Sequence, residues 1–471
     1  MKINLEKIRM KEADPQERAK TFSEVALGYT EEQALNEAQR CIQCKNPTCV
    51  QGCPVEINIP LFIKHITEKQ FSESLKVIKQ KNNLPAICGR VCPQEKQCQL
   101  KCIIGKKGAP VSIGSLERFV SDCEVNKETN SKSEIRNPDT LNTNSHKIAI
   151  AGSGPAGLTC AGDLARDGFD VTVYEALHAS GGVLRYGIPP FRLPRKILDF
   201  EVNYLKSIGV KFLFNTLIGA TYTIPDLFNM GYKSIFIGSG AGLPVFPKIP
   251  GENLCRIYSA NEFLTRINLM NTIEFPKFDT PINIGSNIVT IGGGNTAMDS
   301  ARCALRLINA SRINGSSTIL YRRTESEMPA RKDEIEHAKQ EGIKFMFLIQ
   351  PIRFINDDKG YVTGIECLKC ELGEPDSSGR RKPVPVKGSE FVYPCDTVVL
   401  ALGLNPNPLI PKFTPEIKTN KWGDIIVDQE TMETSMPNVY AGGDIVGGEG
   451  TVIEAMGMGK KAAKSIKKKL T

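Results

Sequence analysis

The chain has 471 residues, too many for one hydrophobic core, and this length favours about three domains. Its 41% hydrophobic and 24% charged residues are typical of a globular protein, and its net charge of +8 is mild. Because no aromatic-rich basic stripe accompanies it, that charge favours an acidic partner protein or anionic cofactors over nucleic acid. Apolar runs stay below the roughly 18 residues of a membrane span, and the charged N-terminus lacks a signal-peptide core, so we expect a cytoplasmic protein with no membrane partner.

The N-terminal region shows the helical spacing of apolar residues, in segments 31–42 and 56–80, without strand-like alternation. Eight of the fifteen cysteines crowd into residues 41–102. Because disulfides are rare in cytoplasmic proteins, this crowding favours metal ligation or redox chemistry. We therefore predict an all-helical, metal-binding domain over residues 1–123.

The crowded cysteines form two runs. They are CIQCKNPTCVQGCP, with Cys41, Cys44, Cys49 and Cys53, and CGRVCPQEKQCQLKC, with Cys88, Cys92, Cys98 and Cys102. Tight runs containing Cys-Pro are typical of iron–sulfur clusters, because one loop must wrap a cubane, and the last cysteine of a run can bind the neighbouring cluster. Zinc is the alternative, but zinc fingers favour paired knuckles with histidine, and only His65 lies nearby. We predict two 4Fe–4S clusters.

A polar segment rich in Asn, Ser and Thr follows, and we assign residues 124–146 to a linker. From Lys147 onward the chain contains two strand–glycine turn–helix units, at 147–175 and 287–324, together with further strand-like segments. Alternating strands and helices predict doubly wound parallel sheets. Two such units on one chain indicate two bound dinucleotides.

The first unit has the pattern of a dinucleotide-binding turn. The strand KIAIA precedes GSGPAG, and the next strand ends at Glu175. The glycines allow a tight turn, close approach of a pyrophosphate and packing of helix on strand, and the acid suits ribose hydroxyls. This predicts FAD or NAD at the first unit. FAD is the prediction here, because the second unit, described next, fits NADPH. The residues expected at the cofactor are Gly152, Gly154, Pro155, Ala156, Gly157 and Glu175.

The second unit contains the glycine turn GGGNTAMD, and its second strand ends in two arginines. Ala297 takes the third glycine position and is still small enough for close packing. The next strand ends in Arg322 and Arg323 where an acid would stand for NAD, and two guanidiniums fit the 2′-phosphate of NADP. A solvated surface pair is the alternative. We predict NADPH at Gly292, Gly294, Asn295, Thr296, Arg322 and Arg323.

A third segment, MPNVYAGGDIVGGEGTVIEAMGMG, supports FAD binding. A strand leads to Asp444, and Gly450 and Thr451 open a helix. An acid in this place can bond the ribityl or pyrophosphate region, and the helix N-terminus can stabilise negative charge on a reduced flavin ring. We therefore include these three residues in the predicted FAD site.

The expected fold is α/β, with an N-terminal all-helical iron–sulfur domain followed by two doubly wound, Rossmann-like dinucleotide-binding domains. We place a discontinuous FAD domain at 147–250 plus 396–471 and the NADPH domain at 251–395. Cys367 and Cys370 form a Cys-x-x-Cys in a strand-like segment, and we expect buried or half-buried thiols there and not a redox pair.

Taken together, the motifs resemble one known family. RCIQC, GCPVEINIP, CGRVCPQE, IGSLERF, GSGPAG, GGVLRYGIPPFRLP, GGGNTAMD, YRRTESEMPA, ELGEPDSSGRRKPVP and AGGD are similar to those of the glutamate synthase small (β) subunits. That family includes the large subunit of NADH-dependent ferredoxin:NADP oxidoreductase (the sulfide dehydrogenase α type) and the N-terminal half of dihydropyrimidine dehydrogenase. The resemblance extends from Phe22 to the C-terminus.

The resemblance implies a set of cofactor contacts. It gives one cluster to Cys41, Cys44, Cys49 and Cys102, and the cluster nearer the flavin to Cys53, Cys92, Cys98 and Glu117. It leaves Cys88 without a ligand role, and Glu117 stands where dihydropyrimidine dehydrogenase has glutamine. The alternative is that Cys88 completes an all-thiolate cubane and Glu117 lies on the wet face of a helix. The resemblance also places Gly182, Val183 and Arg192 at FAD, and Ala401, Leu402 and Gly403 near the nicotinamide.

These expectations together describe an NADPH-dependent oxidoreductase. Hydride would pass from NADPH to FAD, and single electrons would pass through two 4Fe–4S clusters to an acceptor. The expected acceptor is a partner protein, such as a synthase large subunit, a small flavoprotein or a ferredoxin. A stand-alone diaphorase that reduces soluble acceptors is the alternative, and a non-catalytic redox sensor or scaffold is a more distant one.

Overall fold

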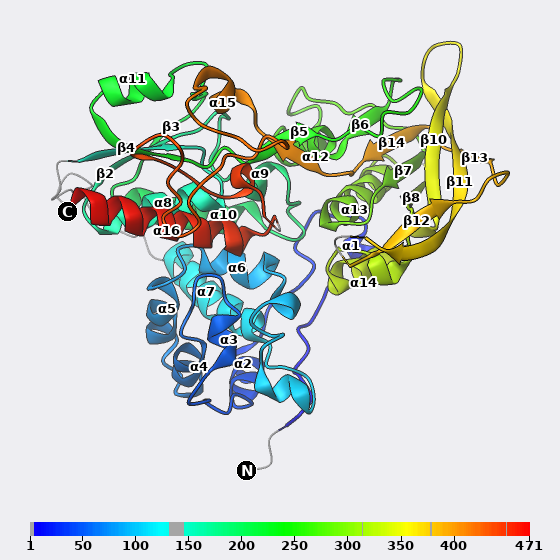
Figure 1. The fold of residues 1–471 in the computed structure, drawn as a ribbon. Helices are drawn as coiled ribbons and strands as arrows, with labels where there is room; N and C mark the ends of the chain where they lie inside the picture. The colour runs from blue at the N-terminus through cyan, green and yellow to red at the C-terminus, as the bar shows by residue number, and fades with distance from the viewer. Residues whose placement is uncertain (1–3, 131–145, 313, 377–378, 449) are drawn as a thin grey trace.

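The computed structural model describes residues 4–130, 146–312, 314–376, 379–448 and 450–471. Figure 1 shows a helical domain at the bottom, a first α/β domain at the upper left and a second α/β domain at the upper right. The first α/β domain is formed by two stretches of chain, one before and one after the second α/β domain. The expected fold class is confirmed. Within the described ranges, no helix is both long and apolar enough to cross a membrane.

The helical domain consists of short helices whose ends are fixed by local hydrogen bonds. α2 (Glu31–Ala38) begins after Thr30, whose hydroxyl accepts from the Gln33 amide while the Gln33 side chain accepts from the Thr30 amide. α7 (Ile113–Asn130) runs into the segment expected to be a linker, so the linker prediction was wrong up to Asn130, and residues 131–145 lie outside the described residues. The other elements are α1 (Pro15–Arg18), α3 (Thr48–Gln51), α4 (Ile59–Thr67), α5 (Phe71–Lys79), α6 (Pro85–Val91), η1 (Gln94–Lys96) and η2 (Ile103–Lys106).

The first α/β domain contains five parallel strands in the order β16-β4-β1-β2-β3. The central strand β1 (Lys147–Ala151) pairs with β2 (Asp170–Tyr174) on one side and β4 (Tyr232–Ile237) on the other. Helices α8 (Pro155–Arg166) and α16 (Val452–Leu470) pack against each other between this sheet and the helical domain (Figure 1). The remaining elements are β3 (Lys211–Leu213), β16 (Val439–Ala441), α9 (Val183–Tyr186), α10 (Arg195–Ser207), α11 (Ile224–Asn229), α15 (Leu409–Phe413) and η6 (Asp444–Val446).

The second α/β domain repeats this plan with five parallel strands in the order β6-β14-β7-β8-β9. β7 (Asn287–Ile291), α13 (Asn295–Ala310) and β8 (Ser316–Tyr321) form the predicted strand–turn–helix–strand unit. An antiparallel sheet of β10 to β13 stands beside it, at the right of Figure 1. The remaining elements are β6 (Ile257–Ser259), β9 (Lys344–Phe347), β10 (Ile349–Asn356), β11 (Val362–Pro375), β12 (Arg381–Pro385), β13 (Phe391–Pro394), β14 (Thr397–Leu400), α12 (Ala260–Asn268), α14 (Lys332–Gln340), η4 (Thr272–Glu274) and η5 (Glu325–Glu327).

The boundary expected between residues 395 and 396 was wrong. β14 lies in the second sheet, where it pairs in parallel with β7 on one side and β6 on the other. Its four residues are fully buried, and a short buried strand carries no local mark of the sheet it joins. The return to the first domain comes later, after β15 (Leu404–Pro406), which pairs with β5 (Ala241–Pro244) to connect the two domains.

A buried cluster of charges joins three parts of the chain. Glu341 pairs with Arg302 and Arg306 of α13 at 2.7 Å each and with Arg18 of the N-terminal segment at 3.1 Å. Burial alone would raise the pKa of Glu341, but the bonds and charges of Arg302 and Arg306 outweigh burial and lower it to about 2. The ring of Phe191, from the first α/β domain, lies 4.5 Å and 4.0 Å from these two guanidiniums. The cluster therefore fixes the N-terminal segment to the second α/β domain.

Replacement of Glu341 with glutamine is expected to lower the free energy of unfolding by about 3–5 kcal/mol, because it leaves buried guanidiniums without their counter-charge. Urea unfolding followed by circular dichroism measures this change. Glu336→Gln is the matched control, since Glu336 is exposed and not in this cluster. Equal stability of the two variants would contradict the role of Glu341.

Candidate functional site

A cavity of about 1140 Å³ lies where the two α/β domains face each other. Pockets for one small ligand typically measure about 300–1,000 Å³, so this cavity has room for more. Its wall includes both glycine turns, the start of α16 and, from the helical domain, Val91 and Pro93. Every residue predicted at either dinucleotide lines the cavity except Gly157, which packs beneath the first turn.

The first glycine turn has no room for side chains. A Cβ at Gly152, where φ is +106°, would lie 2.5 Å from the Gly238 carbonyl oxygen. A Cβ at Gly157 would lie 2.0 Å from the carbonyl oxygen of Gly152, so α8 approaches β1 at backbone distance. Gly154 caps α8, whose N-terminus opens on the cavity. This bare turn at a helix N-terminus fits the pyrophosphate of a dinucleotide.

Glu175 is fixed at the end of β2, beside this turn. Its Oε2 accepts hydrogen bonds from the amide and the hydroxyl of Ser153, and its Oε1 accepts from the Leu177 amide at 2.9 Å. Although Glu175 is only 5% exposed, it lines the cavity. An acid in this place fits ribose hydroxyls and disfavours a 2′-phosphate.

The other residues expected at FAD lie around the same end of the cavity. Gly182 approaches the first turn closely, since a Cβ on it would lie 2.9 Å from the Cα of Gly154. Thr451 caps α16, so a second helix N-terminus opens on the cavity, and burial raises the pKa of Asp444 nearby. Two helix N-termini on one cavity favour a ligand with anionic groups.

Arg192 has a role that the sequence did not indicate. Its Nη1 lies 2.6 Å from Asp299 and its Nε lies 3.0 Å from Glu334, both in the second α/β domain. The guanidinium therefore bridges the two α/β domains at the cavity wall. Asp299 belongs to the motif GGGNTAMD, but nothing in the sequence paired it with an arginine from another domain.

The second glycine turn matches the first. A Cβ at Gly292 would lie 2.3 Å from the Ala401 carbonyl oxygen, and Gly294 caps α13. Ala297, in the third glycine position, is fully buried. The turn thus brings Ala401, and with it Leu402 and Gly403, to the same cavity as the first turn. The two predicted dinucleotide sites face each other across one space.

The structure separates the two arginines that follow β8. Arg322 is exposed, whereas Arg323 is only 5% exposed. The guanidinium of Arg323 donates to the Arg381 carbonyl oxygen at 2.6 Å and to Asp376 at 2.5 Å. A carboxylate therefore already neutralises Arg323, and the two arginines do not form an equivalent pair.

Four cysteines lie near the surface of the helical domain. Cys41, Cys44, Cys49 and Cys102 surround a small hollow and are partly exposed. They are the four that the family resemblance assigns to one cluster. We call them the outer set.

A second group lies deeper. Cys53, Cys92, Cys98 and Glu117, which we call the inner set, are 6–8% exposed. Burial, together with the nearby Glu117 carboxylate, raises the pKa of the Cys53 thiol to about 11. Among the described residues, no three His, Cys, Asp or Glu side chains converge on one point at single-ion distance. A 4Fe–4S cubane is larger and takes one protein ligand at each of its four irons, and each set contains four candidate ligands.

Glu117 does not lie on the wet face of its helix, so this part of the alternative was wrong, and whether Cys88 is a ligand stays a question for experiment. It is buried, its Oε1 accepts a 2.7 Å hydrogen bond from Asn82, and burial raises its pKa to about 8. Cys88 is buried beside the inner set, with its sulfur 3.7 Å from the Asn82 side-chain oxygen and 3.5 Å from the sulfur of Met456. Asn82 was missed because it lies outside every cysteine motif.

The inner set adjoins the cavity. Cys92 stands between Val91 and Pro93, which line the cavity wall. Pro54, which follows Cys53, approaches α16, since a Cβ at Gly457 would lie 3.0 Å from its carbonyl oxygen. The wall of the cavity and the wall of the inner set are thus formed by the same short segments.

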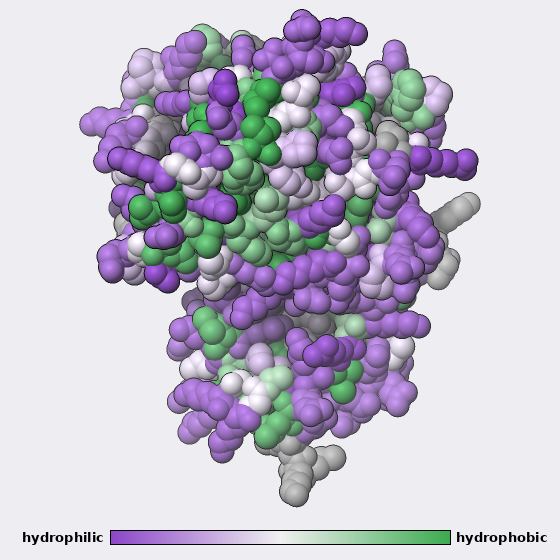
Figure 2. Space-filling view, turned by 90° about the vertical axis from the view of Figure 1, so that its right-hand side faces the viewer, coloured by the Kyte–Doolittle hydropathy of each residue, from purple (hydrophilic) through white to green (hydrophobic). Residues whose placement is uncertain are grey.

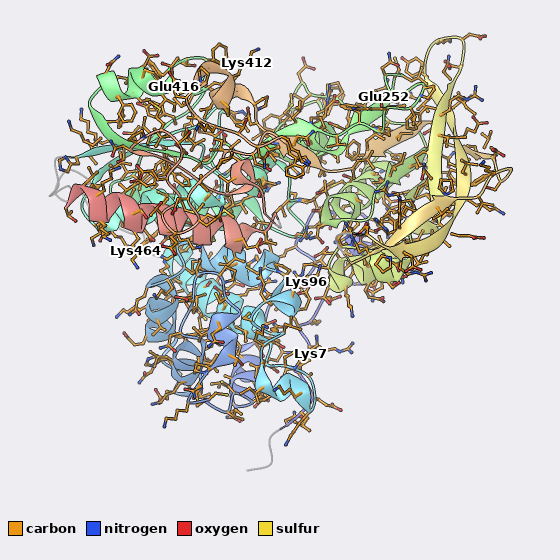
Figure 3. All side chains as sticks on the ribbon, viewed as in Figure 1. Lys7, Lys96, Glu252, Lys412, Glu416 and Lys464 are labelled. Carbon is orange, nitrogen blue, oxygen red and sulfur yellow. The ribbon has the colours of Figure 1, made fainter. Side chains whose placement is uncertain are left out.

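The helical domain also contacts the second α/β domain near the cavity. Figure 3 labels Lys96 at this junction, where its ammonium donates to the Pro329 carbonyl oxygen at 2.9 Å. Arg331 adds a 3.0 Å ion pair to Glu95. The helical domain therefore touches both α/β domains.

Comparison with known proteins defines the class. Residues 18–129 match the family described as dihydropyrimidine dehydrogenase domain II, 4Fe–4S cluster, and residues 146–459 match the pyridine nucleotide-disulphide oxidoreductases. The structure of Mycobacterium tuberculosis FprA in complex with NADPH has the same fold, with a TM-score of 0.57 and 21% identity over 69% of this chain and 85% of that chain. The chain is thus a pyridine nucleotide-type oxidoreductase with an N-terminal 4Fe–4S domain.

Two relatives define the family within this class. The glutamate synthase [NADPH] small chain of Azospirillum brasilense is 35% identical over 458 residues, which cover 96% of this chain and 92% of the relative. The NADPH-Fe(3+) oxidoreductase subunit beta of Geobacter sulfurreducens is 35% identical over 480 residues, covering 95% and 67%. The chain belongs to the family of glutamate synthase small chains, as the motifs indicated.

The ligand role of Glu117 is tested by two substitutions. Glu117→Cys is expected to keep the iron content and to lower the reduction potential of one cluster, because a thiolate donates more charge to iron than a carboxylate does. Cys88→Ala, the control in the same buried region, is expected to leave iron content and spectra unchanged. Potentiometric titration followed by electron paramagnetic resonance measures both. Loss of a cluster in Cys88→Ala, with no shift in Glu117→Cys, would reverse the assignment.

Proposed function

We propose that this chain oxidises NADPH at the cavity and delivers single electrons, through two 4Fe–4S clusters in the helical domain, to a partner protein. The observation that carries this proposal is the continuity of the cavity wall with the inner cysteine set at Val91, Cys92 and Pro93. When bound, FAD supplies the conversion of a two-electron hydride into single electrons, and the clusters supply one-electron carriage.

The protein contributes position and electrostatics. FAD is assigned to the first glycine turn with Glu175, and NADPH to the second glycine turn with Arg322. The bridge from Arg192 to Asp299 and Glu334 sets the distance between the two turns, which is what a transfer between bound cofactors requires. The N-termini of α8 and α16 favour negative charge at the first site.

The two cysteine sets lie at different depths below the surface, and this difference suggests the direction of electron transfer. The inner set is buried against α16 and the cavity, and the outer set lies near the surface of the helical domain. We assign one cubane to each set, so that electrons enter at the inner set and leave at the outer set. The relatives carry names of subunits, a small chain and a subunit beta, which supports a partner protein as acceptor.

The surface around the outer set has the chemistry of a docking site. Ile42, Leu100 and Ile103 are 43%, 64% and 39% exposed, and in Figure 2 apolar groups interrupt the hydrophilic surface of the helical domain, the lower part of the view.

The same surface is basic. The segments 41–55 and 97–110, which contain the outer set, include no acidic residue. Their exposed lysines are Lys45, Lys101, Lys106 and Lys107. Figure 3 labels a further lysine, Lys7, on this domain. Such a surface suits an acidic redox partner.

Cofactor content tests the two-cluster assignment. The chain, purified without exposure to oxygen, is expected to contain about eight iron atoms, about eight acid-labile sulfides and about one FAD, since each cubane holds four of each atom. Iron and sulfide assays with flavin fluorescence measure these values. About four iron atoms per chain would contradict the second cluster, and zinc without labile sulfide would contradict both clusters.

Docking at the outer set is tested by charge reversal. The double substitution Lys106→Glu and Lys107→Glu is expected to slow reduction of an acidic ferredoxin about tenfold at low salt, because steering depends on complementary charge. Reduction of menadione, a neutral acceptor, is expected to be unchanged. The matched control is Lys464→Glu with Lys468→Glu on α16, where Figure 3 labels Lys464 far from the lower end of the helical domain.

The same experiment separates the alternatives. Equal effects of the two double variants would place docking elsewhere. If the wild-type chain reduces menadione fast and the ferredoxin not at all, the stand-alone diaphorase is favoured.

A further inference from the structure

The 2′-phosphate end of the cavity contains an arginine that comes from outside the dinucleotide-binding unit. Arg380 lines the cavity together with Arg322, and it lies at the tip of the hairpin formed by β11 and β12. We propose that Arg380, and not Arg323, is the second guanidinium that binds the 2′-phosphate of NADPH, and that Arg323 is a positioning residue that holds this hairpin at the cavity. The inference rests on the proposed assignment of NADPH to the second glycine turn.

Backbone hydrogen bonds join the described residues at the end of this hairpin. The amide of Asp376 donates to the Arg380 carbonyl oxygen at 2.8 Å, and the amide of Gly379 donates to the Asp376 carbonyl oxygen at 2.9 Å. Pro375 stands opposite Arg381 in the strand register. The position of Arg380 therefore follows that of the hairpin. Whatever holds the hairpin in place also holds Arg380 at the cavity.

Arg323 is that anchor. Its Nε donates to the Arg381 carbonyl oxygen at 2.6 Å, and its Nη2 pairs with the Asp376 carboxylate at 2.5 Å. Both bonds reach the hairpin tip from the end of β8, with the Arg323 side chain 6% exposed. The guanidinium thus ties the tip to the strand whose end faces the adenosine part of a dinucleotide.

Charge distinguishes the roles of the three arginines. Asp376 balances Arg323, so this pair adds little net positive charge at the cavity. All three arginines line the cavity, but Arg322 is exposed and Arg380 half-buried, whereas Arg323 is buried against Asp376. A phosphate monoester carries about −1.5 to −2 charges at neutral pH, which matches two guanidiniums. One is supplied by β8 and the other by the hairpin.

The binding of two small nucleotides tests this assignment, because their affinities do not depend on flavin reduction. 2′,5′-ADP carries the 2′-phosphate and 5′-ADP lacks it, and isothermal titration calorimetry measures the affinity of the holoenzyme for each. Arg322→Ala and Arg380→Ala are each expected to weaken 2′,5′-ADP about tenfold or more, with 5′-ADP within about twofold of wild type. Arg380→Lys is expected to recover part of the loss. Lys382→Ala, the same charge change on the same hairpin but away from the cavity lining, is expected to have no effect.

The positioning role of Arg323 has its own test. Arg323→Ala is expected to weaken 2′,5′-ADP about as much as Arg380→Ala does, and combining the two is expected to add little, because both remove the same contact. Additive losses would show that Arg323 contacts the phosphate itself and would overturn this part. Wild-type affinity in Arg380→Ala, or an equal loss in Lys382→Ala, would overturn the role of Arg380.

Failure of the underlying cofactor assignment gives a different result. In that case the wild-type chain would bind 2′,5′-ADP no tighter than 5′-ADP and would oxidise NADH as fast as NADPH. A wild-type preference for the 2′-phosphate that Arg380→Ala retains would instead leave NADPH in place and refute only the present inference.

Discussion

Helix α16 packs at backbone distance on two opposite sides, and the spacing between the proposed FAD site and the proposed cluster sites depends on this packing. A Cβ at Gly459 would lie 2.3 Å from the Ala156 carbonyl oxygen, and a Cβ at Gly457 would lie 3.0 Å from that of Pro54. Two residues apart on a helix correspond to about 200° of rotation, so the two glycines face different neighbours. One face of α16 meets the first glycine turn, and the other meets the loop that carries Cys53. A side chain at either glycine would push the helical domain or the flavin-type turn away from α16.

The second α/β domain is oriented by buried ion pairs in addition to the apolar contacts around Phe191. Arg192 forms ion pairs with Asp299 and Glu334 of the second α/β domain. Glu341 forms ion pairs with Arg18 and with two arginines of α13. Buried ion pairs are sensitive to geometry, because their attraction offsets the cost of desolvation only when the partners meet closely. They therefore specify one relative placement of the two dinucleotide sites. The N-terminal segment takes part in this, so a stretch that precedes the cysteine motifs helps to set the distance between the two turns.

Features encoded in contiguous sequence were the ones predicted correctly. The two strand–glycine turn–helix units and the helical, cysteine-rich region all depend on residues within about one element of each other, so spacing alone indicates them. The place of β14 could not be predicted in this way, because a strand of four buried residues pairs equally well with either sheet. Glu117 was out of reach for the same reason. Its burial and its hydrogen bond from Asn82 are tertiary features, and only the family resemblance pointed to it.

The arginines at the end of β8 show why a correct local pattern can still give an incomplete site. Successive residues that leave a strand point to different sides, so adjacent arginines seldom serve one ligand equally. Here Arg322 is exposed to the cavity, and Arg323 turns inward to Asp376 and the carbonyl oxygen of Arg381. The sequence supplies the two charges side by side, but the fold uses one of them on the ligand side and the other to bring in a distant hairpin. A site predicted from one motif therefore identifies the element that faces the ligand, and the tertiary contacts of that element decide which side chains complete it.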